Sequence, residues 1–304
     1  MKKIRAWIVT ARLPTLLLSV SGILVGGSLT INSHGFSWIV FLMILMTAIS
    51  LQILANFAND YGDFVKGTDD EERKGPKRSL QRGLLTIREI KRAISIMIIL
   101  IIVLSLGFLS ISFGLAHFDY FVFIGLILAL SIIAALKYTV GKFAYGYSGL
   151  GDLSVLLFFG VFSVLGTQFI MSHQISFNGV IWAFIIGLCC VAVLNINNIR
   201  DIENDRNKGK ITLAVILGIR GSFLYHYLLI LSVILAIGYL KFVRPGNHLF
   251  QIIVFGSVII LLISNTLYLS RAKKLSKMNL TLKQMSLITF LIGFILFFES
   301  LFSI

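Results

Sequence analysis

The sequence predicts an all-α integral membrane protein, and three observations support this fold class. Of its 304 residues, 57% are hydrophobic and 13% are charged, with a mean hydropathy of +0.94, far from the values of soluble proteins. Apolar stretches close to the roughly 20 residues needed to cross a bilayer recur along the chain. Lysine and arginine are concentrated in every second connection between these stretches. We therefore expect a bundle of about nine transmembrane helices, near 14–31, 37–57, 91–111, 118–138, 152–172, 178–197, 222–241, 249–270 and 284–303.

The first predicted span follows a basic segment, residues 1–13, without a convincing signal-peptide cleavage site between them. We therefore expect an uncleaved first span. The basic segment is typical of an interfacial stretch whose charged and indole side chains lie at the level of the lipid headgroups. These side chains are Lys2, Lys3, Arg5, Trp7 and Arg12.

The basic residues predict the topology of the bundle. Lysine and arginine together number 27 against 13 aspartates and glutamates. When the nine spans are threaded alternately, all of these bases except Lys241 and Arg244 fall on one side of the membrane. This bias is typical of cytoplasmic loops, where anionic lipids also attract bases. We expect the bilayer as a partner and no nucleic acid, and we place the connections 58–90 and 198–221 in the cytoplasm.

The second predicted span continues into an acidic stretch at 56–70, NFANDYGDFVKGTDD. Its first four polar residues have the spacing i, i+3, i+4, i+7, which places them on one face if the helix continues that far. We expect the chain to unwind at the glycines of this region. The polar residues are Asn56, Asn59, Asp60 and Asp63, and the glycines are Gly62, Gly67 and Gly75.

The sixth predicted span continues in the same way into 195–210, NINNIRDIENDRNKGK. Asn197, Asp201 and Asp205 recur every four residues and therefore share one helical face. The two stretches align as N-[DN]-x-x-D, with four predicted helices between them, which indicates a weak internal repeat. We interpret residues 1–304 as one domain with two weakly similar halves, whose acidic stretches both end on the cytoplasmic side.

Carboxylates and amides of this density suit a hard cation such as Mg²⁺, and Mg²⁺ favours phosphate oxygens as its remaining ligands. A diphosphate is the simplest partner that would relieve the repulsion between two acidic helix ends. Each of the neighbouring bases can equally be a solvated loop residue that marks topology. For the four aspartates this plain interpretation is weak, because carboxylates crowded at membrane helix ends are costly without a ligand. The bases are Lys74, Lys77, Arg78, Arg82, Arg200, Arg206, Lys208 and Lys210.

Other catalytic constellations are not evident in the sequence. Cys189 and Cys190 are adjacent within a span, so they match neither a disulfide nor a metal-site spacing, and we expect them to be small core residues. The histidines form no pattern with cysteine or with serine and aspartate. The chemistry must therefore be sought among the carboxylates.

Four stretches of the sequence resemble motifs of the UbiA superfamily of intramembrane prenyltransferases. They are NFANDYGDFVKGTD, GPKRSLQRGLLT, YTVGKFAYGYSGLGDLSVLLFFGVFSVLGT and NNIRDIENDRNKGKITLAVILG, in the family's order and at family-like separations over most of the chain. Within the family, the sequence is most similar to the enzymes that prenylate 1,4-dihydroxy-2-naphthoate in menaquinone biosynthesis. One departure is visible, because Gly67 replaces the last aspartate of the first motif and Asp69 follows two residues later.

The resemblance implies a helical bundle around a central cavity, capped on its cytoplasmic side and open laterally to lipid, in the cytoplasmic membrane of a prokaryote. It implies that a polyprenyl diphosphate binds through Mg²⁺ and that the naphthoate is prenylated with decarboxylation, giving demethylmenaquinol. The implied Mg²⁺ ligands are Asp60, Asp63, Asp201 and Asp205, which with Lys142 and Tyr138 form the catalytic set. The implied substrate-binding residues are Asn56, Asn59, Arg78, Arg82, Tyr145, Tyr147, Asp152, Asn197, Asn198, Arg200 and Lys210.

The tyrosines of this set, together with Tyr61, are candidates to shield an allylic cation through their ring faces, or else they are interfacial belt residues. Lys142 and Asp152 lie near the cavity in the matching family stretch. Lys142 could hold the diphosphate or the acceptor's carboxylate, and Asp152 could orient either substrate.

Three alternatives remain open at this point. An ion-coupled transporter also places acids near broken helices, but these carboxylates lie at helix ends beside basic loops and not at the midplane. A phosphatidyl-group transferase would carry a D-G-x-x-A-R pattern, which the sequence lacks. Within the superfamily, the other acceptors are 4-hydroxybenzoate, homogentisate, haem and glyceryl phosphate, and the stretch 138–167 favours the naphthoate over them.

Overall fold

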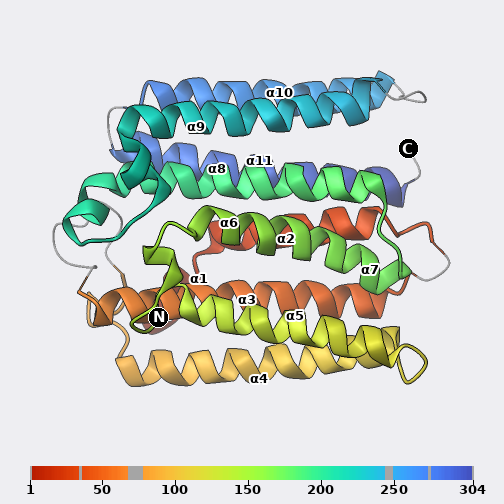
Figure 1. Ribbon diagram of the computed structural model, residues 1–304, viewed down its shortest axis with the longest axis horizontal. Coiled ribbons are helices and arrows are strands. Elements are labelled where there is room, and N and C mark those ends of the chain that lie inside the picture. The colour runs from red at the N-terminus through yellow and green to blue at the C-terminus, as the bar shows by residue number, and fades with distance from the viewer. Residues whose placement is uncertain (1, 34–35, 68–77, 244–248, 273–274, 303–304) are drawn as a thin grey trace.

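The computed structural model describes residues 2–33, 36–67, 78–243, 249–272 and 275–302, and these residues are almost entirely helical (Figure 1). Within these ranges there is no β-strand, only an isolated bridge between Ser148 and Ile211. A 3₁₀ turn spans Tyr145–Tyr147, and π-helices span Leu156–Leu165 and Tyr239–Val243. The α-helices are α1 (Lys2–Ala11), α2 (Leu13–Ser28), α3 (Trp38–Val65), α4 (Ile87–Ser112), α5 (Phe118–Lys137), α6 (Gly151–Val155), α7 (Gly166–Ser172), α8 (Phe177–Asn207), α9 (Leu213–Gly238), α10 (Leu249–Ser270) and α11 (Leu275–Leu301).

The described helices confirm the expected number of spans. Eight are long and apolar enough to cross a membrane, and the pair α1 and α2, bent by 45° at Arg12, makes up a ninth. The fifth span is composite, because α6, the π-helix Leu156–Leu165 and α7 follow one another without a break. Helices α3 and α8 both continue past their predicted ends into the acidic stretches.

Several helices begin at residues whose side chains satisfy the first free backbone N–H groups. Ser37 caps α3, Ser176 caps α8 and Thr212 caps α9. Thr86 and Glu89 form a reciprocal capping box at the start of α4. These local signals fix where the long helices start.

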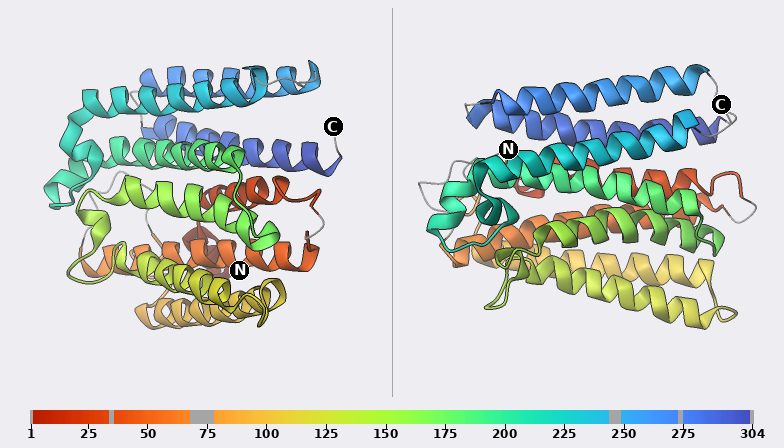
Figure 2. Two further views of the ribbon diagram at one scale, coloured as in Figure 1. Left: turned by 45° about the vertical axis from the view of Figure 1, so that its right-hand side comes forward. Right: turned by 45° about the horizontal axis from the view of Figure 1, so that its top comes forward.

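The helices form stacked layers (Figures 1 and 2). Helices α9 and α10 lie along one edge of the bundle and α4 lies along the other. Helix α2 packs against α11 and the π-helix, α8 packs against α9 and the π-helix, and α3 packs against α4 and α5. Helices α3 and α8 run in the same direction, so their carboxyl ends meet at the left-hand end of Figure 1. The two acidic stretches therefore lie at one end of the bundle.

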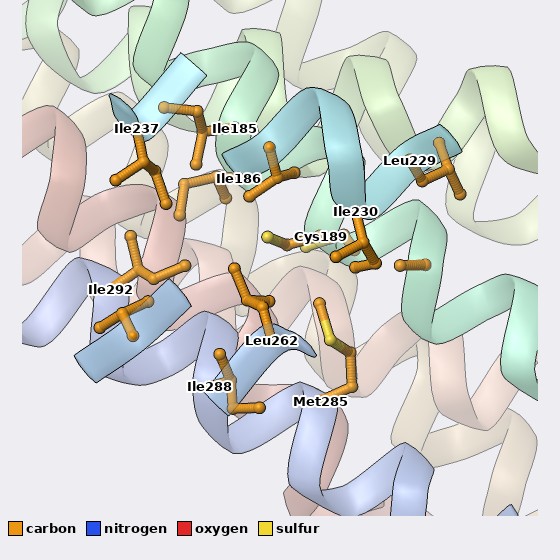
Figure 3. Close-up of a cluster of buried hydrophobic side chains, with 14 of the residues drawn as sticks. Ile185, Ile186, Cys189, Leu229, Ile230, Ile237, Leu262, Met285, Ile288 and Ile292 are labelled. Carbon is orange, nitrogen blue, oxygen red and sulfur yellow. The ribbon is translucent and has the colours of Figure 1, made fainter. Parts of the chain in front are cut away.

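The largest apolar core lies among α8, α9, α10 and α11 (Figure 3). Ile185, Cys189, Leu262 and Ile292 are fully buried there. Cys189 and Cys190 are free buried cysteines, as expected from their position within a span. This half of the bundle is densely packed, and it supports the α8 wall of the site.

One basic residue is buried away from the acidic stretches. Lys241 lies within the π-helix Tyr239–Val243, and its Nζ donates to both carboxylate oxygens of Glu299 at 3.0 Å. Its Nζ also lies 4.6 Å from the centre of the Phe255 ring. Burial of a charge requires such a partner, and Glu299 supplies it for Lys241, one of the two bases predicted on the opposite side of the membrane. The second exception, Arg244, lies outside the described residues.

Candidate active site

A pocket of about 740 Å³ opens between α2, α3, α5, α8 and the composite fifth span. On α3 its lining residues run from Ile44 to Asp63, about 28 Å of helix at 1.5 Å per residue. The far end is apolar and the end beside the acidic stretches is polar. The apolar end includes Ile23, Ile44, Phe108, Ile124 and Ile170. The polar end includes Arg12, Asn56, Asn59, Asp60, Asp63, Arg78, Asn197, Asn198, Arg200, Lys210, Asn279 and Lys283.

All four polar residues predicted to share one face of the first stretch line the pocket, because α3 continues to Val65. Asp60 forms ion pairs with Arg12, at 2.5 Å, and with Arg78. Asp63 accepts a hydrogen bond from Arg78 Nη2 at 2.8 Å and another from the Tyr147 hydroxyl at 2.8 Å. Arg78 therefore bridges the two carboxylates, and its planar guanidinium suits this paired geometry.

Arg12 occupies the break between α1 and α2, where the backbone is left-handed at φ 52°. Asn56 Nδ2 stabilises the break by donating to the Ala11 carbonyl at 2.8 Å and to Thr15 Oγ1 at 3.0 Å. The bend turns the Arg12 side chain onto Asp60, a contact that the sequence did not predict. A proline at 14, in the first turn of a new helix, is the local signal for this break.

The helix does not unwind at Gly62, contrary to the prediction. Residue 62 is a glycine because a Cβ there would lie 2.6 Å from Thr139 Oγ1 and 2.8 Å from the Thr139 backbone. Thr139 Oγ1 in turn contacts the Ala58 carbonyl and Asn59 Oδ1. Gly67, which has a φ of 68°, follows the end of the helix, and Gly75 lies outside the described residues. The close approach at Gly62 therefore joins α5 to the first motif.

The second stretch carries local ion pairs. Arg200 donates from Nε and Nη2 to the two Asp201 oxygens, at 2.9 and 2.6 Å, and also contacts Asn197 and Asn279. Lys210 Nζ lies 3.5 Å from Asp205 Oδ1. Asp205 Oδ2 is buried and has no hydrogen-bond partner among the described residues. Asn197, Asn198, Arg200 and Lys210 line the pocket, whereas Asp201 and Asp205 lie buried just behind that wall.

Tyr147 lies between the two stretches. Its backbone carbonyl accepts a hydrogen bond from the Ile211 N–H at 3.1 Å, and the Gly149 N–H donates to the Ile211 carbonyl at 2.8 Å. The Lys210 Nζ lies 5.6 Å from the centre of the Tyr147 ring, whose hydroxyl binds Asp63. Asp63 also interacts electrostatically with Lys210 and with Asp205. The two acidic stretches therefore converge through Tyr147 and Lys210.

Tyr138 and Tyr145 form an aromatic corner of the pocket, with ring centroids 5.3 Å apart at 87°. Burial, and then the nearby Asp152 carboxylate, raises the pKa of the Tyr138 hydroxyl, and burial also raises the pKa of Tyr145. Both side chains therefore remain neutral phenols near pH 7. The Tyr145 hydroxyl donates to the Ala134 carbonyl at 3.0 Å, which fixes its ring.

The family model that matches residues 19–288 describes the UbiA prenyltransferase family. The chain belongs to this family. Two relatives named 1,4-dihydroxy-2-naphthoate octaprenyltransferase support the assignment. The relative from Haemophilus influenzae is 42% identical over 96% of this chain and 94% of its own length. The relative from Escherichia coli is 45% identical over 75% of this chain and 73% of its own length.

Solved structures of UbiA homologues share this fold. The apo structure of a homologue from Aeropyrum pernix superposes with a TM-score of 0.68 at 15% identity, covering 96% of this chain and 98% of the other. A homologue from Archaeoglobus fulgidus bound to DMAPP and Mg²⁺ gives a TM-score of 0.64 at 15% identity, covering 98% and 99%. The UbiA assignment makes this chain a membrane-embedded prenyltransferase, and it rules out the transporter and phosphatidyl-transferase alternatives.

Several predicted site residues lie outside the pocket of this UbiA protein. Lys142 follows Gly141, which has a φ of 94°, and its side chain is exposed and does not line the pocket, so its expected position near the cavity is wrong. Arg82 is exposed on the loop before α4. Tyr61 packs with the apolar side chains of α1 and α4. Asp69, Lys74 and Lys77 lie outside the described residues.

Asp152 is buried at the start of α6, behind the pocket wall. Tyr225 hydrogen-bonds to it, and its Oδ1 has no hydrogen-bond partner among the described residues. Asp152 interacts electrostatically with Tyr138, which lines the pocket.

Sequence reasoning missed three residues at the polar end. Arg12 was assigned to the headgroup layer, and Asn279 and Lys283 of α11 were not considered. Asn279 Oδ1 accepts a hydrogen bond from Arg200 Nη1 at 2.8 Å, which connects α11 to the second stretch. A polar pair four residues apart near the start of an apolar helix is the signal that could have identified the α11 residues.

Proposed function

We propose that this enzyme transfers a polyprenyl group from a prenyl diphosphate to 1,4-dihydroxy-2-naphthoate, with loss of the carboxyl group, to give demethylmenaquinol. The observation that carries the proposal is a pocket whose polar end has Asp60, Asp63 and several bases, with Asp201 and Asp205 buried behind its wall, and whose other end is a long apolar wall. The names of the relatives from Haemophilus influenzae and Escherichia coli support the naphthoate as acceptor. The bias of the bases toward one side of the membrane supports a position of this polar end near the inner face of a bacterial cytoplasmic membrane.

The residues present fit Mg²⁺. Asp60, Asp63, Asp201 and Asp205 offer only oxygen donors, and the buried Asp205 Oδ2 has no other partner among the described residues. In that part of the chain, no three acidic, histidine or cysteine side chains are grouped as a complete metal site. Mg²⁺ does not need such a group, because it keeps several waters and takes phosphate oxygens as ligands beside one or two carboxylates. When bound, the ion would supply Lewis-acid stabilisation of the charge that develops on the departing diphosphate.

The bases at the polar end are placed to hold the diphosphate. Arg12, Arg78 and Lys210 line the pocket beside the aspartates and carry several N–H donors. As the allylic C–O bond breaks, its electron pair leaves on the diphosphate oxygen, and fixed cations stabilise that charge without having to reorganise. These side chains are already held by Asp60, Asp63 and Asp205, so their positions are set before substrate binds.

The rest of the pocket suits the prenyl group and the acceptor. The apolar wall that reaches Ile44 and Phe108 can bury the tail and exclude water from the allylic cation. The ring faces of Tyr138 and Tyr145 can stabilise that cation, because an aromatic face attracts positive charge. The electron-rich naphthoate ring forms the new C–C bond, and the carboxylate leaves as CO₂, which restores the aromatic ring.

A radiolabelled transfer assay with purified protein tests the proposal. The acceptors are 1,4-dihydroxy-2-naphthoate, 4-hydroxybenzoate and homogentisate, with farnesyl or a longer diphosphate as donor and EDTA as the control. We expect Mg²⁺-dependent label only in a decarboxylated naphthoquinol. Label on another acceptor would overturn the naphthoate assignment, and transfer that persists in EDTA would overturn the metal assignment.

A further inference from the structure

A basic groove lies on the outer surface of α4, separate from the active-site pocket. It has a volume of about 690 Å³ and is lined by Ile87, Arg88, Lys91, Arg92, Ser95 and Ile96. None of these residues lines the pocket of the UbiA site. Helix α4 forms an outer edge of the bundle, and it begins at the end where the acidic stretches lie (Figure 1). The groove therefore faces outward at the end of the bundle that carries the catalytic aspartates.

The bases of this groove have no carboxylate partner among the described residues. Arg88, Lys91 and Arg92 are exposed and form no ion pair with described residues, although Lys91 Nζ lies 5.3 Å from the centre of the Tyr61 ring. The acidic side chain on the same turn, Glu89, is already paired with Lys3 of α1. This differs from the active site, where Arg12, Arg78, Arg200 and Lys210 all bind aspartates. Three positive charges therefore lie within two helical turns without a carboxylate partner among the described residues.

The same face of α4 becomes apolar immediately beyond the bases. Positions 88, 92, 96, 99 and 103 are spaced by four, four, three and four residues, so they form one line along the helix. Ile96 is 59% exposed, Ile99 61% and Val103 60%. Because α4 lies at the outer edge of a membrane-spanning bundle, these large exposed aliphatic side chains face lipid chains. The line therefore passes from cationic headgroup level to hydrocarbon level along a single helix.

We propose that this groove binds an anionic phospholipid, with its phosphate on Arg88, Lys91 and Arg92 and an acyl chain along Ile96, Ile99 and Val103. Charge complementarity identifies the headgroup, because basic clusters at the inner membrane surface attract anionic lipids. The line of exposed aliphatic side chains indicates that the ligand also carries an acyl chain. A prenyl diphosphate shares the phosphate and the apolar chain, but the groove lies outside the pocket that contains the aspartates. A resident phospholipid is therefore the occupant that this surface fits.

Titration of the purified protein with fluorescent phosphatidylglycerol, in micelles of a neutral detergent, tests the proposal. The test variant combines Arg88→Gln, Lys91→Gln and Arg92→Gln. The matched control combines Arg220→Gln, Arg271→Gln and Lys277→Gln, which removes the same charge from exposed residues near the same end of the bundle. We expect the test variant to bind phosphatidylglycerol at least about tenfold more weakly and the control to stay within about twofold of wild type. Equal weakening in both variants would show diffuse attraction and overturn the proposal.

Two further measurements keep the result interpretable. Prenyl transfer in neutral lipid should be unchanged in both triple variants, which shows that they are folded. If the triple variant does not fold, Ile99→Asp on its own should weaken phosphatidylglycerol binding by placing a negative charge on the acyl-chain line, and unchanged binding would contradict the proposal. Displacement of phosphatidylglycerol by excess geranylgeranyl diphosphate in wild type, but not in the α4 variant, would assign the groove to the prenyl donor and overturn the phospholipid assignment.

Discussion

The two acidic stretches are similar in sequence but are held by different partners. Asp60 and Asp63 of the first stretch line the pocket, and their bases come from distant positions, with Arg12 48 residues and Arg78 18 residues from Asp60. Asp201 of the second stretch binds Arg200, its immediate neighbour, and Asp205 binds Lys210. The first stretch therefore depends on how the chain folds around it, whereas the second is largely assembled from its own segment.

This difference indicates a division of roles within the site. The geometry around Asp60 and Asp63 depends on the positions of α1, α2 and the loop before α4, because Arg12 and Arg78 come from these segments. A carboxylate held by its neighbours stays in place as long as α8 is intact. We therefore expect substitutions at the first stretch to affect substrate binding most, and substitutions at the second to affect both catalysis and the stability of the α8 wall.

The largest expected effect is at the aspartates themselves. Asp63→Asn and Asp201→Asn should each lower prenyl transfer by about 100-fold or more, because each removes a negative charge from the proposed metal site. Asp201→Asn should also lower the thermal unfolding temperature in detergent more than Asp63→Asn, since it leaves the buried Arg200 without its charge partner. Transfer assays and thermal unfolding measure the two effects. Normal turnover in either variant would remove that aspartate from the site.

Arg78→Ala should have the next largest effect. It removes the guanidinium that bridges Asp60 and Asp63, and it should raise the KM for the prenyl diphosphate by about tenfold or more. The KM for the acceptor should change less. Arg82→Ala is the matched control, because Arg82 is exposed four residues further along the same loop. A donor KM that is the same in both variants would show that Arg78 does not hold the diphosphate.

Arg12→Ala should have a smaller effect in the same direction. Arg12 pairs only with Asp60 among the described carboxylates, so we expect the donor KM to rise by about three- to tenfold. Arg5→Ala provides the comparison, because Arg5 is an exposed base on α1. Steady-state kinetics with varied prenyl diphosphate measures both variants. Equal donor KM values in Arg5→Ala and Arg12→Ala would show that Arg12 does not contribute to diphosphate binding.

The smallest effect is expected at Gly62. Gly62→Ala places a Cβ against the Thr139 backbone, which should destabilise the protein by about 1–3 kcal/mol and disturb the adjacent aspartates. Gly238→Ala is the control, since no atom lies within 4 Å of a Cβ at that helical position, and alanine favours helix there. Thermal unfolding measures both. If Gly62→Ala unfolds at the same temperature as wild type or at a higher one, α5 can move away from α3.

Much of this architecture could be predicted from the sequence, because it depends on local periodicity. The apolar stretches predicted the number of spans, and the spacing of Asn56, Asn59, Asp60 and Asp63 predicted one pocket-facing line. The break at Arg12 and the position of Lys142 could not be predicted in the same way. Both lie at left-handed backbone: Arg12 itself, whose side chain binds Asp60, and Gly141, which directly precedes the exposed Lys142.

The pairing of bases with aspartates was also beyond the sequence. Arg78 and Arg82 are both arginines of the same basic loop, and the sequence alone does not distinguish them. Only the path of the loop before α4 brings Arg78 to Asp60 and leaves Arg82 exposed. Asn279 and Lys283 belong to α11, which is more than 60 residues from the second stretch and reaches it through the packing of the bundle.

The π-helix Leu156–Leu165 determines which side chains of the composite span face the pocket. The lining positions of this composite span recur as neighbouring pairs four residues apart, including Phe158 with Phe159 and Phe162 with Ser163. In an α-helix, each step of four residues would rotate such a line by about 40° around the axis. The wider π turns rotate less per residue and cancel that drift. Conversion of 156–165 to regular α-helix at unchanged length would therefore turn Thr167 and Ile170 away from the pocket while leaving their own sequence untouched.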